Sequence, residues 1–292
     1  MHLFCFGLGY VAIRLAKALT ADGWAVAGTT RNPDKAAKLA RIGIDAHVLA
    51  EGTAPDALAE ALAPATHVVA SIPPDDTSDD PDLALRALRA AAGPSLRWAG
   101  YLSSTGVYGD AGGDWVDEDT PPNPVNARAA RRVAAEAAWR RYHQQTGTAL
   151  DILRLAGIYG PARSALDQVR EGRARRVVKP GQLFSRIHVD DIVLAVRACI
   201  AAPDGLRVFN ICDDEPAPPQ DVVAFAAALV GVDPPPEEPY EGAEISEAKR
   251  RFYSGNRRVS SARIKAALGL AWQHPDYRAG LRALAGHDQA GQ

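Results

Sequence analysis

The chain has 292 residues, of which 47% are hydrophobic and 23% are charged, and its formal net charge is -2 at pH 7. This composition suits a globular protein with one large domain or two smaller ones. A slightly negative chain offers no basic surface to a phosphate backbone, so we expect no nucleic acid partner. The apolar run from Ile192 to Ala202 is interrupted by Arg197, and no run approaches the ~20 residues of a membrane span, so we expect no membrane partner.

The three cysteines, Cys5, Cys199 and Cys212, lie in apolar segments and lack the spacing of metal ligands. We therefore expect small core residues in a reduced compartment and no metal site. The opening segment, residues 1–6, is apolar but has no basic leader, which favours a first strand over a signal peptide. Together these features predict a cytoplasmic protein.

Short apolar segments alternate with alanine- and leucine-rich helical segments in the first half of the chain. This alternation predicts an α/β fold. We expect a Rossmann-type doubly wound parallel sheet, with helices on both faces and right-handed crossovers. The expected strands are residues 3–6, 25–30, 46–49, 67–71, 98–103 and 149–155, and the expected helices include residues 11–21 and 82–92.

The chain changes character after Pro161, where arginine clusters and proline-rich loops become frequent. We expect a cofactor-binding Rossmann domain over residues 1–160, with a strand and a helix contributed from about residues 183–212. Residues 161–292 are expected to form mainly a smaller lobe that binds the substrate.

A glycine-rich segment follows the first expected strand and opens the first expected helix. Gly7, Leu8, Gly9, Tyr10, Val11 and Ala12 match the G-x-G-x-x-(G/A) fingerprint of dinucleotide-binding folds. The first glycine permits the tight turn, and the second lets the backbone approach the pyrophosphate. Ala12 keeps the helix close to the sheet, with the helix N-terminus facing the anion.

The residue type about 20 positions past the glycines distinguishes the two nicotinamide dinucleotides. An Asp or Glu there would accept hydrogen bonds from a free ribose 2′-hydroxyl, but this chain has Thr30 and Arg31. A hydroxyl and a guanidinium can both donate to a 2′-phosphate, so the sequence favours NADP over NAD. The alternative interpretation is that Arg31 only begins a solvated helix.

Four further segments resemble motifs of one enzyme family, the extended short-chain dehydrogenase/reductases, which include NAD(P)-dependent sugar-nucleotide epimerases, dehydratases and reductases. The matching segments are SSTGVYG at 103–109, RLAGIYGP at 154–161, IHVDD at 187–191 and FNI at 209–211. They span most of the chain, and the chain resembles an atypical branch of this family.

The resemblance implies roles for several residues near the cofactor. Ser104 takes the position of the hydroxyl that holds the substrate oxygen beside the nicotinamide, and Ser103 lies under the nicotinamide ribose. Ser71 and Pro73, after the fourth strand, contact the middle of the cofactor. The alternative for Ser104 is a hydroxyl at a strand end that bonds only to nearby backbone.

The chain departs from the family at the usual Tyr-x-x-x-Lys pair. Counting back from Glu136, which matches a family glutamate, places Arg128 at the tyrosine position and Arg132 at the lysine position. Arg132 keeps a positive charge and donors for ribose hydroxyls, but an arginine at position 128 stays protonated near neutral pH and cannot shuttle a proton. Arg128 either binds an anionic group of a ligand or belongs to a solvated helix face.

Other side chains can be considered for the missing proton transfer. Tyr108 and Asp80 lie near the relevant motifs, but a packed, hydrogen-bonded side chain is the simpler interpretation of Tyr108. Tyr142 is interpreted as a packing residue. Asp190 and Asp191, after His188, are interpreted as acids at a helix N-terminus.

Two functions remain open from the sequence. One is an NADP-dependent oxidoreductase or nucleotide-sugar epimerase-like enzyme that acts on a carbonyl or hydroxyl carbon, with a small-molecule substrate such as a nucleotide sugar. The other is a catalytically silent protein that senses NADP(H), with Arg128 and Arg132 as anchors. The sequence favours the enzyme, because Ser104 and the fingerprint are retained, and it leaves open whether the chain forms a homo-oligomer.

Overall fold

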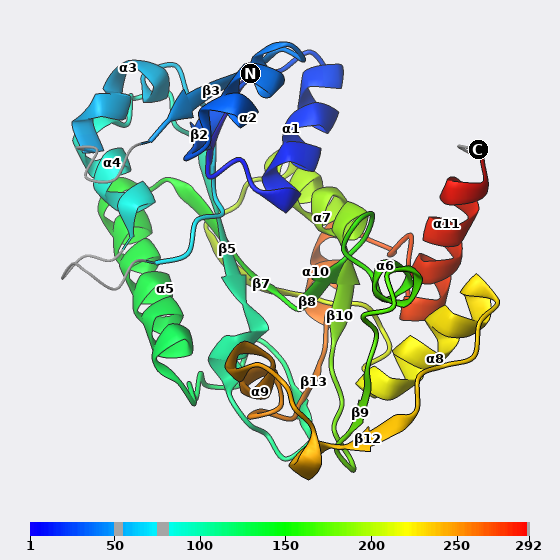
Figure 1. Cartoon of the computed structure of the whole chain (residues 1–292). Helices are drawn as coiled ribbons and strands as arrows, with labels where there is room; N and C mark the ends of the chain where they lie inside the picture. Colours follow the sequence, from blue (N-terminus) through cyan, green and yellow to red (C-terminus); the bar gives the residue numbers. More distant parts are fainter. Residues whose placement is uncertain (50–54, 75–81, 291–292) are drawn as a thin grey trace. The chain divides into compact units, whose positions relative to one another are not determined.

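The computed structural model describes residues 1–49, 55–74 and 82–290 (Figure 1). These residues form two compact units, each assembled from three stretches of chain. Unit 1 comprises Met1–Ser104, Asn126–Arg154 and Val193–Phe209, and unit 2 comprises Thr105–Val125, Leu155–Ile192 and Asn210–Gln292.

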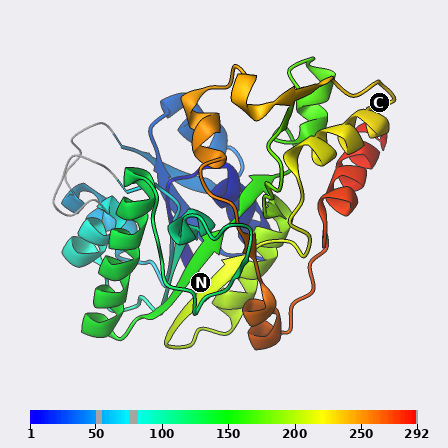
Figure 2. The same ribbon diagram turned by 90° about the horizontal axis from the view of Figure 1, so that it is seen from below.

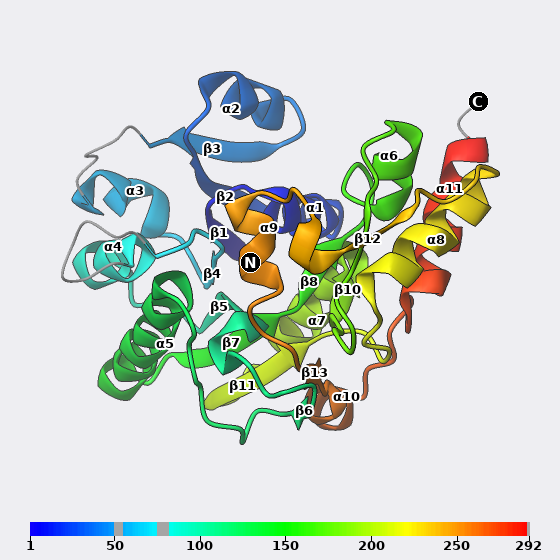
Figure 3. The same ribbon diagram turned by 60° about the horizontal axis from the view of Figure 1, so that its bottom comes forward.

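Unit 1 is built on a seven-stranded sheet with the strand order β11-β7-β5-β4-β1-β2-β3, which can be followed across Figure 3. β1 pairs in parallel with β2 and β4, β2 with β3, and β4 with β5. The sheet confirms the predicted Rossmann-type α/β fold. The strands are β1 His2–Phe6, β2 Ala25–Thr30, β3 Ile44–Val48, β4 His67–Ala70, β5 Trp98–Ser104, β7 Ala149–Leu155 and β11 Leu206–Ile211.

Several helices of unit 1 begin directly after a residue whose side chain caps them. Asn32, Asp82 and Asn126 each accept a backbone N–H in the first turn of the helix that follows. The helix expected over residues 82–92 therefore begins one residue later, because Asp82 is its cap. The helices are α1 Tyr10–Ala21, α2 Pro33–Ala40, α3 Ala59–Leu62, α4 Leu83–Ala91, α5 Ala127–Thr146 and most of α7 Val189–Ala201, with a short 3-10 turn η1 at Pro55–Leu58.

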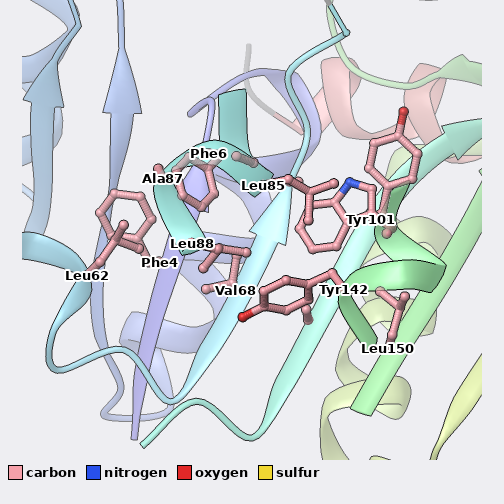
Figure 4. Close-up of a cluster of buried hydrophobic side chains, with 14 of the residues drawn as sticks. Phe4, Phe6, Leu62, Val68, Leu85, Ala87, Leu88, Tyr101, Tyr142 and Leu150 are labelled. Atoms are coloured by element: carbon pink, nitrogen blue, oxygen red, sulfur yellow. The ribbon is translucent and has the colours of Figure 1, made fainter. Parts of the chain in front are cut away.

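One face of the sheet is covered by α3, α4 and α5, which are coloured from blue-cyan to green and lie together in Figures 2 and 3. Phe4, Phe6 and Val68 point from the strands into a buried cluster that Leu85 and Trp139 complete from the helices. Figure 4 shows part of this cluster. Burial of these large apolar side chains is the main force that holds the helices on the sheet.

Unit 2 contains short strands that pair in twos and helices around a second core. The parallel pairs are β8 Gly157–Tyr159 with β10 Arg186–His188, β9 Arg176–Val178 with β12 Glu237–Pro239, and β6 Trp115–Val116 with β13 Arg258–Val259. The helical elements are η2 Thr105–Tyr108, α6 Ala165–Arg170, α8 Pro219–Val230, η3 Tyr240–Gly242, α9 Glu247–Phe252, α10 Ala262–Leu268 and α11 Tyr277–Ala290, together with the first turn of α7. Leu166, Val222 and Leu281 are among the core residues of α6, α8 and α11.

The division of the chain is more interleaved than the sequence predicted. Residues 105–125 belong to unit 2 and not to the cofactor domain expected over residues 1–160, and only residues 193–209 of the expected 183–212 segment belong to unit 1. The three cysteines are buried and unpaired, as expected. In the part of the chain that the structure describes, no helix has both the length and the apolar composition needed to cross a bilayer.

Candidate functional site

The loop between β1 and α1 is held in a tight turn by its neighbours. Gly7 has a φ of +87°, in the left-handed region, and a Cβ there would lie 2.6 Å from Cγ2 of Ile72. The N–H of Gly7 donates to Oγ1 of Thr29 at 2.8 Å, and the N–H of Leu8 donates to the carbonyl of Thr29 at 2.7 Å. Both the turn and the packing therefore require glycine at position 7.

Gly9 stands in a different environment. Its φ is −87°, and a Cβ at this position would meet no heavy atom within 4 Å. α1 begins at the next residue, and no side chain caps its N-terminus. The backbone N–H groups of a first helical turn and the helix dipole favour an anion, and the open space beside Gly9 gives a pyrophosphate room to approach.

The next two fingerprint residues have distinct surroundings. Val11, in the first turn of α1, is buried. The guanidinium of Arg14 lies 4.0 Å from the centre of the Tyr10 ring, on the same helix. The first turn of α1 therefore has a buried side chain and a cation–π contact within the helix.

Ser71 follows β4 and contacts the fingerprint loop. Its hydroxyl donates to the carbonyl oxygens of Phe6 and Gly7, at 3.1 and 2.6 Å. Pro73, two residues later, is exposed. The structure thus brings Ser71 to the fingerprint loop, where it braces the turn.

The end of β2 places Thr30 and Arg31 close to the fingerprint loop, because Thr29 bonds to that loop directly. Thr30 is half-buried, and its Oγ1 accepts the N–H of Asn32 at 3.3 Å. Arg31 is exposed. The first acidic side chain after β2 is Asp34, in the first turn of α2.

A buried ionic network lies beneath the carboxyl end of β5. The Ser103 hydroxyl donates to Oε1 of Glu136 at 2.6 Å, and Glu136 pairs with Arg154 at 2.7 Å. The side chains of Arg154 and Glu136 are 3% and 4% exposed. The side chain of Ser103 is therefore committed to the network, whereas Ser104, the last residue of β5, is half-buried.

The two arginines of α5 differ in their environment. Nη1 of Arg132 donates to the carbonyl of Leu102 at 2.9 Å and lies 3.5 Å from the Tyr101 hydroxyl. Its guanidinium is thus held at the carboxyl end of β5, where the strand ends at Ser104. Arg128, one turn earlier, is exposed and makes no hydrogen bond or ion pair with the described residues.

Tyr108, the tyrosine considered for proton transfer, is engaged in packing, as are Tyr142 and Tyr101 of unit 1. Within unit 2, Tyr108 is 2% exposed, and its hydroxyl donates to Oδ1 of Asn210 at 2.8 Å. Tyr142 packs edge-on against Trp139, and burial raises its pKa. Burial also raises the pKa of Tyr101. Asp80 lies outside the described residues.

Sequence reasoning missed two residues of β2 that shape the loop. Thr29 provides both acceptors described above, and a Cβ at Gly28 would lie 2.6 Å from the Cys5 carbonyl and 3.0 Å from Cγ of Leu8. The position of β2 beside β1 in a Rossmann sheet is the signal that could have identified them. Their contacts arise from the pairing of β2 with β1, which joins residues about 23 positions apart and which no local motif contains.

Comparisons with known proteins agree with this arrangement. Residues 7–212 match the model of the NAD dependent epimerase/dehydratase family. Protein YeeZ of Escherichia coli (strain K12) is 32% identical over 285 residues, which cover 92% of this chain and 95% of that protein. The solved structure of a functionally unknown conserved protein from Silicibacter pomeroyi DSS is 44% identical, covers 98% of both chains and has a TM-score of 0.88.

A more distant solved structure shares the fold. UDP-glucuronic acid 4-epimerase from Bacillus cereus, in complex with UDP-glucuronic acid and NAD, is 17% identical, covers 100% of both chains and has a TM-score of 0.78. The family match covers well over half of the chain and includes both the fingerprint loop and the end of β5. The chain therefore belongs to the NAD-dependent epimerase/dehydratase family of enzymes, of the extended short-chain dehydrogenase/reductase type.

Proposed function

We propose that the chain is an NADP(H)-dependent oxidoreductase that acts at a carbonyl or hydroxyl carbon. The observation that carries the proposal is the fingerprint loop, where Gly7 is required by the protein itself but Gly9 is not. A glycine that the fold does not need, beside an uncapped helix N-terminus, fits a backbone that a pyrophosphate approaches. When bound, the nicotinamide supplies or accepts a hydride.

The preference for NADP rests on the end of β2. Arg31 is exposed, and Thr30 presents a hydroxyl beside it. Neither residue carries the negative charge that would repel a 2′-phosphate, and a guanidinium can bind such a group with two charge-assisted hydrogen bonds. Asn32 is already used as the cap of α2.

Residues near the end of β5 have separate roles in binding the substrate and the cofactor in this proposal. Ser104 orients the substrate oxygen, and Arg132, whose Nε and Nη2 have no acceptor among the described residues, offers donors to the ribose hydroxyls. Arg128 binds an anionic group of the substrate and does not transfer a proton, because a guanidinium keeps its proton at neutral pH. Because the hydroxyl of Ser103 is bonded to Glu136, we assign Ser103 to holding β5 in place.

Unit 2 would supply most of the substrate contacts, as the sequence predicted for residues 161–292. The Bacillus cereus relative was solved with a nucleotide sugar. Nucleotide sugars are therefore the first class of substrate to test, followed by simpler carbonyl compounds. In this proposal, the protein is an enzyme that acts on a small molecule in the cytoplasm.

The test is a calorimetric titration of the purified chain with NADPH and NADH. We expect tighter binding of NADPH, with the preference lost in Arg31→Ala and kept in Arg41→Ala, which removes another exposed arginine near α2. If neither dinucleotide binds a properly folded sample, the cofactor assignment is wrong. If both bind equally and Arg31→Ala changes nothing, the NADP preference is wrong.

A second candidate function is a silent NADP(H) sensor. It rests on Arg128, which the resemblance places at the position of the family's tyrosine. Restoring both family residues in Arg128→Tyr/Arg132→Lys separates the two functions. A working enzyme with its own chemistry would lose activity in the double variant. A silent protein would gain reductase activity or remain inactive while still binding NADP(H).

A further inference from the structure

A buried cluster in unit 2, separate from the residues assigned to the cofactor, brings together two histidines and a carboxylate. His188 ends β10, Asp191 lies in the first turn of α7, and His274 lies in the loop before α11. Their side chains are 2%, 0% and 12% exposed. The three metal-ligating side chains thus come from two segments, residues 188–191 and the distant His274.

The donor atoms of the cluster already lie close together. Nδ1 of His274 is 3.1 Å from Oδ2 of Asp191, and the rings of His188 and His274 have their centres 3.9 Å apart. One ligand atom from each of the three residues lies within 4.8 Å of the other two. Such a convergence of imidazole and carboxylate groups away from water is typical of a metal site.

The carboxylate of Asp191 is held in a fixed orientation by the backbone. Its Oδ1 accepts the N–H of Gln273 at 2.7 Å, and its Oδ2 accepts the N–H of His274 at 3.0 Å. Backbone bonds of this kind are the outer support that metal-ligating carboxylates usually have. They position Asp191 without using the lone pairs of either histidine.

The cluster lies beside a buried tyrosine. The ring of Tyr159 packs edge-on against His188, with the ring centres 5.2 Å apart. Burial raises the pKa of Tyr159, and the nearby carboxyl groups of Asp213, Asp191 and Asp276 act in the same direction. Tyr159 is itself buried and therefore helps to keep water away from His188.

We propose that His188, Asp191 and His274 bind one transition-metal dication of the zinc class. Imidazole and carboxylate donors suit zinc and its close relatives, whereas calcium and magnesium prefer oxygen donors alone. The sequence predicted no metal site because its cysteines lack the spacing of metal ligands. His188 and Asp191 are three residues apart, but the third proposed ligand, His274, is distant in the sequence.

Only a small adjustment is needed to bind the ion. In a tetrahedral site, ligand atoms at about 2.0 to 2.2 Å from a zinc ion lie at most about 3.6 Å from one another. The His274–Asp191 pair already meets this limit. The ligand atoms of the cluster lie within 4.8 Å of one another, so His188 has to approach the other two residues by at most about 1.2 Å. The bound ion would take the place of the direct contact between His274 and Asp191 and tie the start of α7 to the loop before α11.

The experiment uses the full chain, freed of metal with a chelator that is then removed, and titrated with zinc chloride by calorimetry. We expect one zinc ion per chain. His274→Gln should weaken binding at least about a hundredfold, because it removes a direct ligand. His143→Gln is the matched control, since His143 is a half-buried histidine of α5 whose Nδ1 faces a backbone carbonyl and no carboxylate.

A wild-type chain that takes up no zinc, or that binds it as His274→Gln does, would overturn the proposal. Because the variant can fail to fold, the wild-type chain is also melted with and without zinc. A saturating ion should raise the melting temperature by several degrees, since it binds only the folded state. A melting temperature that zinc leaves unchanged also overturns the proposal.

Discussion

The Ser103 hydroxyl donates to Oε1 of Glu136 at 2.6 Å, and this contact joins the end of β5 to the middle of α5. The strand ends at Ser104, and the helix carries Arg132 one turn before Glu136. Glu136 also receives two hydrogen bonds from Arg154 of β7. The two elements that present the candidate catalytic residues are therefore held by one buried carboxylate.

Replacing the carboxylate of Glu136 should lower the stability of the folded chain. Glu136→Gln leaves Arg154, whose side chain is 3% exposed, without its counter-ion, and we expect a loss of about 3 to 5 kcal/mol in the free energy of unfolding. This loss can be measured by urea denaturation, with circular dichroism as the signal of unfolding. Glu171→Gln is the control, because it removes an exposed pair with Arg173 and should cost less than about 1 kcal/mol. Equal losses in the two variants would contradict the prediction.

The two fingerprint glycines should respond differently to the same substitution. Gly7→Ala combines a φ of +87° with a contact of 2.6 Å, so it should lose about 1 to 3 kcal/mol of stability. Gly9→Ala meets no atom within 4 Å and should change stability by less than about 0.5 kcal/mol. Its Cβ would occupy the space proposed for the pyrophosphate, so NADP(H) affinity should fall at least about tenfold. Thermal melts and calorimetry test both parts, and unchanged affinity in Gly9→Ala would contradict the second.

Arg132 and Arg128 form a matched pair on α5 for a binding experiment. Arg132→Ala removes donors held at the end of β5, so NADP(H) affinity should fall at least about tenfold, with a stability loss of about 1 kcal/mol for the hydrogen bond to Leu102. Arg128→Ala removes an exposed side chain and should leave both quantities nearly unchanged. Equal effects on cofactor affinity would contradict the assignment of Arg132 to the ribose.

His67 should make the stability of unit 1 depend on pH. It is packed beside Trp24 and Trp98, and its pKa is lowered to about 4, mainly by burial and further by Arg97. The unfolded chain therefore binds more protons than the folded chain between pH 4 and 6.5, and the free energy of unfolding rises with pH across this window.

The contribution of His67 should be on the order of 1 to 2 kcal/mol after allowance for solvent screening. His67→Gln should remove this part of the pH dependence, measured by urea denaturation at several pH values between 4 and 7. The same slope in wild type and variant would show that His67 is protonated equally in both states.

The fold could be predicted from the sequence because its signals are local. The strands 25–30 and 149–155 were predicted at their observed bounds, since each is a short apolar run between turn residues. β3 begins two residues before the expected position, because Ile44 pairs with Val26 across the sheet, a contact that no local pattern contains. The interleaving of the two units could not be predicted for the same reason.

The candidate site was predicted less completely. The fingerprint residues have a fixed spacing, so Gly7 and Gly9 could be named from the sequence. The use of the Ser103 hydroxyl by Glu136 depends on how α5 is rotated against β5, which a motif does not encode. The convergence of His188, Asp191 and His274 depends on the path of the whole C-terminal segment.

The interleaved construction of unit 1 also has a consequence for how the chain folds as it is made. β11, which lies at an edge of the sheet beside β7, comes from residues 206–211, after more than one stretch of unit 2 has been synthesised. During translation, the edge of β7 has no partner strand until those residues appear, and unpaired edges can bind other chains. The sheet can be completed only late in synthesis. A nascent chain that stalls before β11 would therefore expose an unpaired strand edge that can bind other chains.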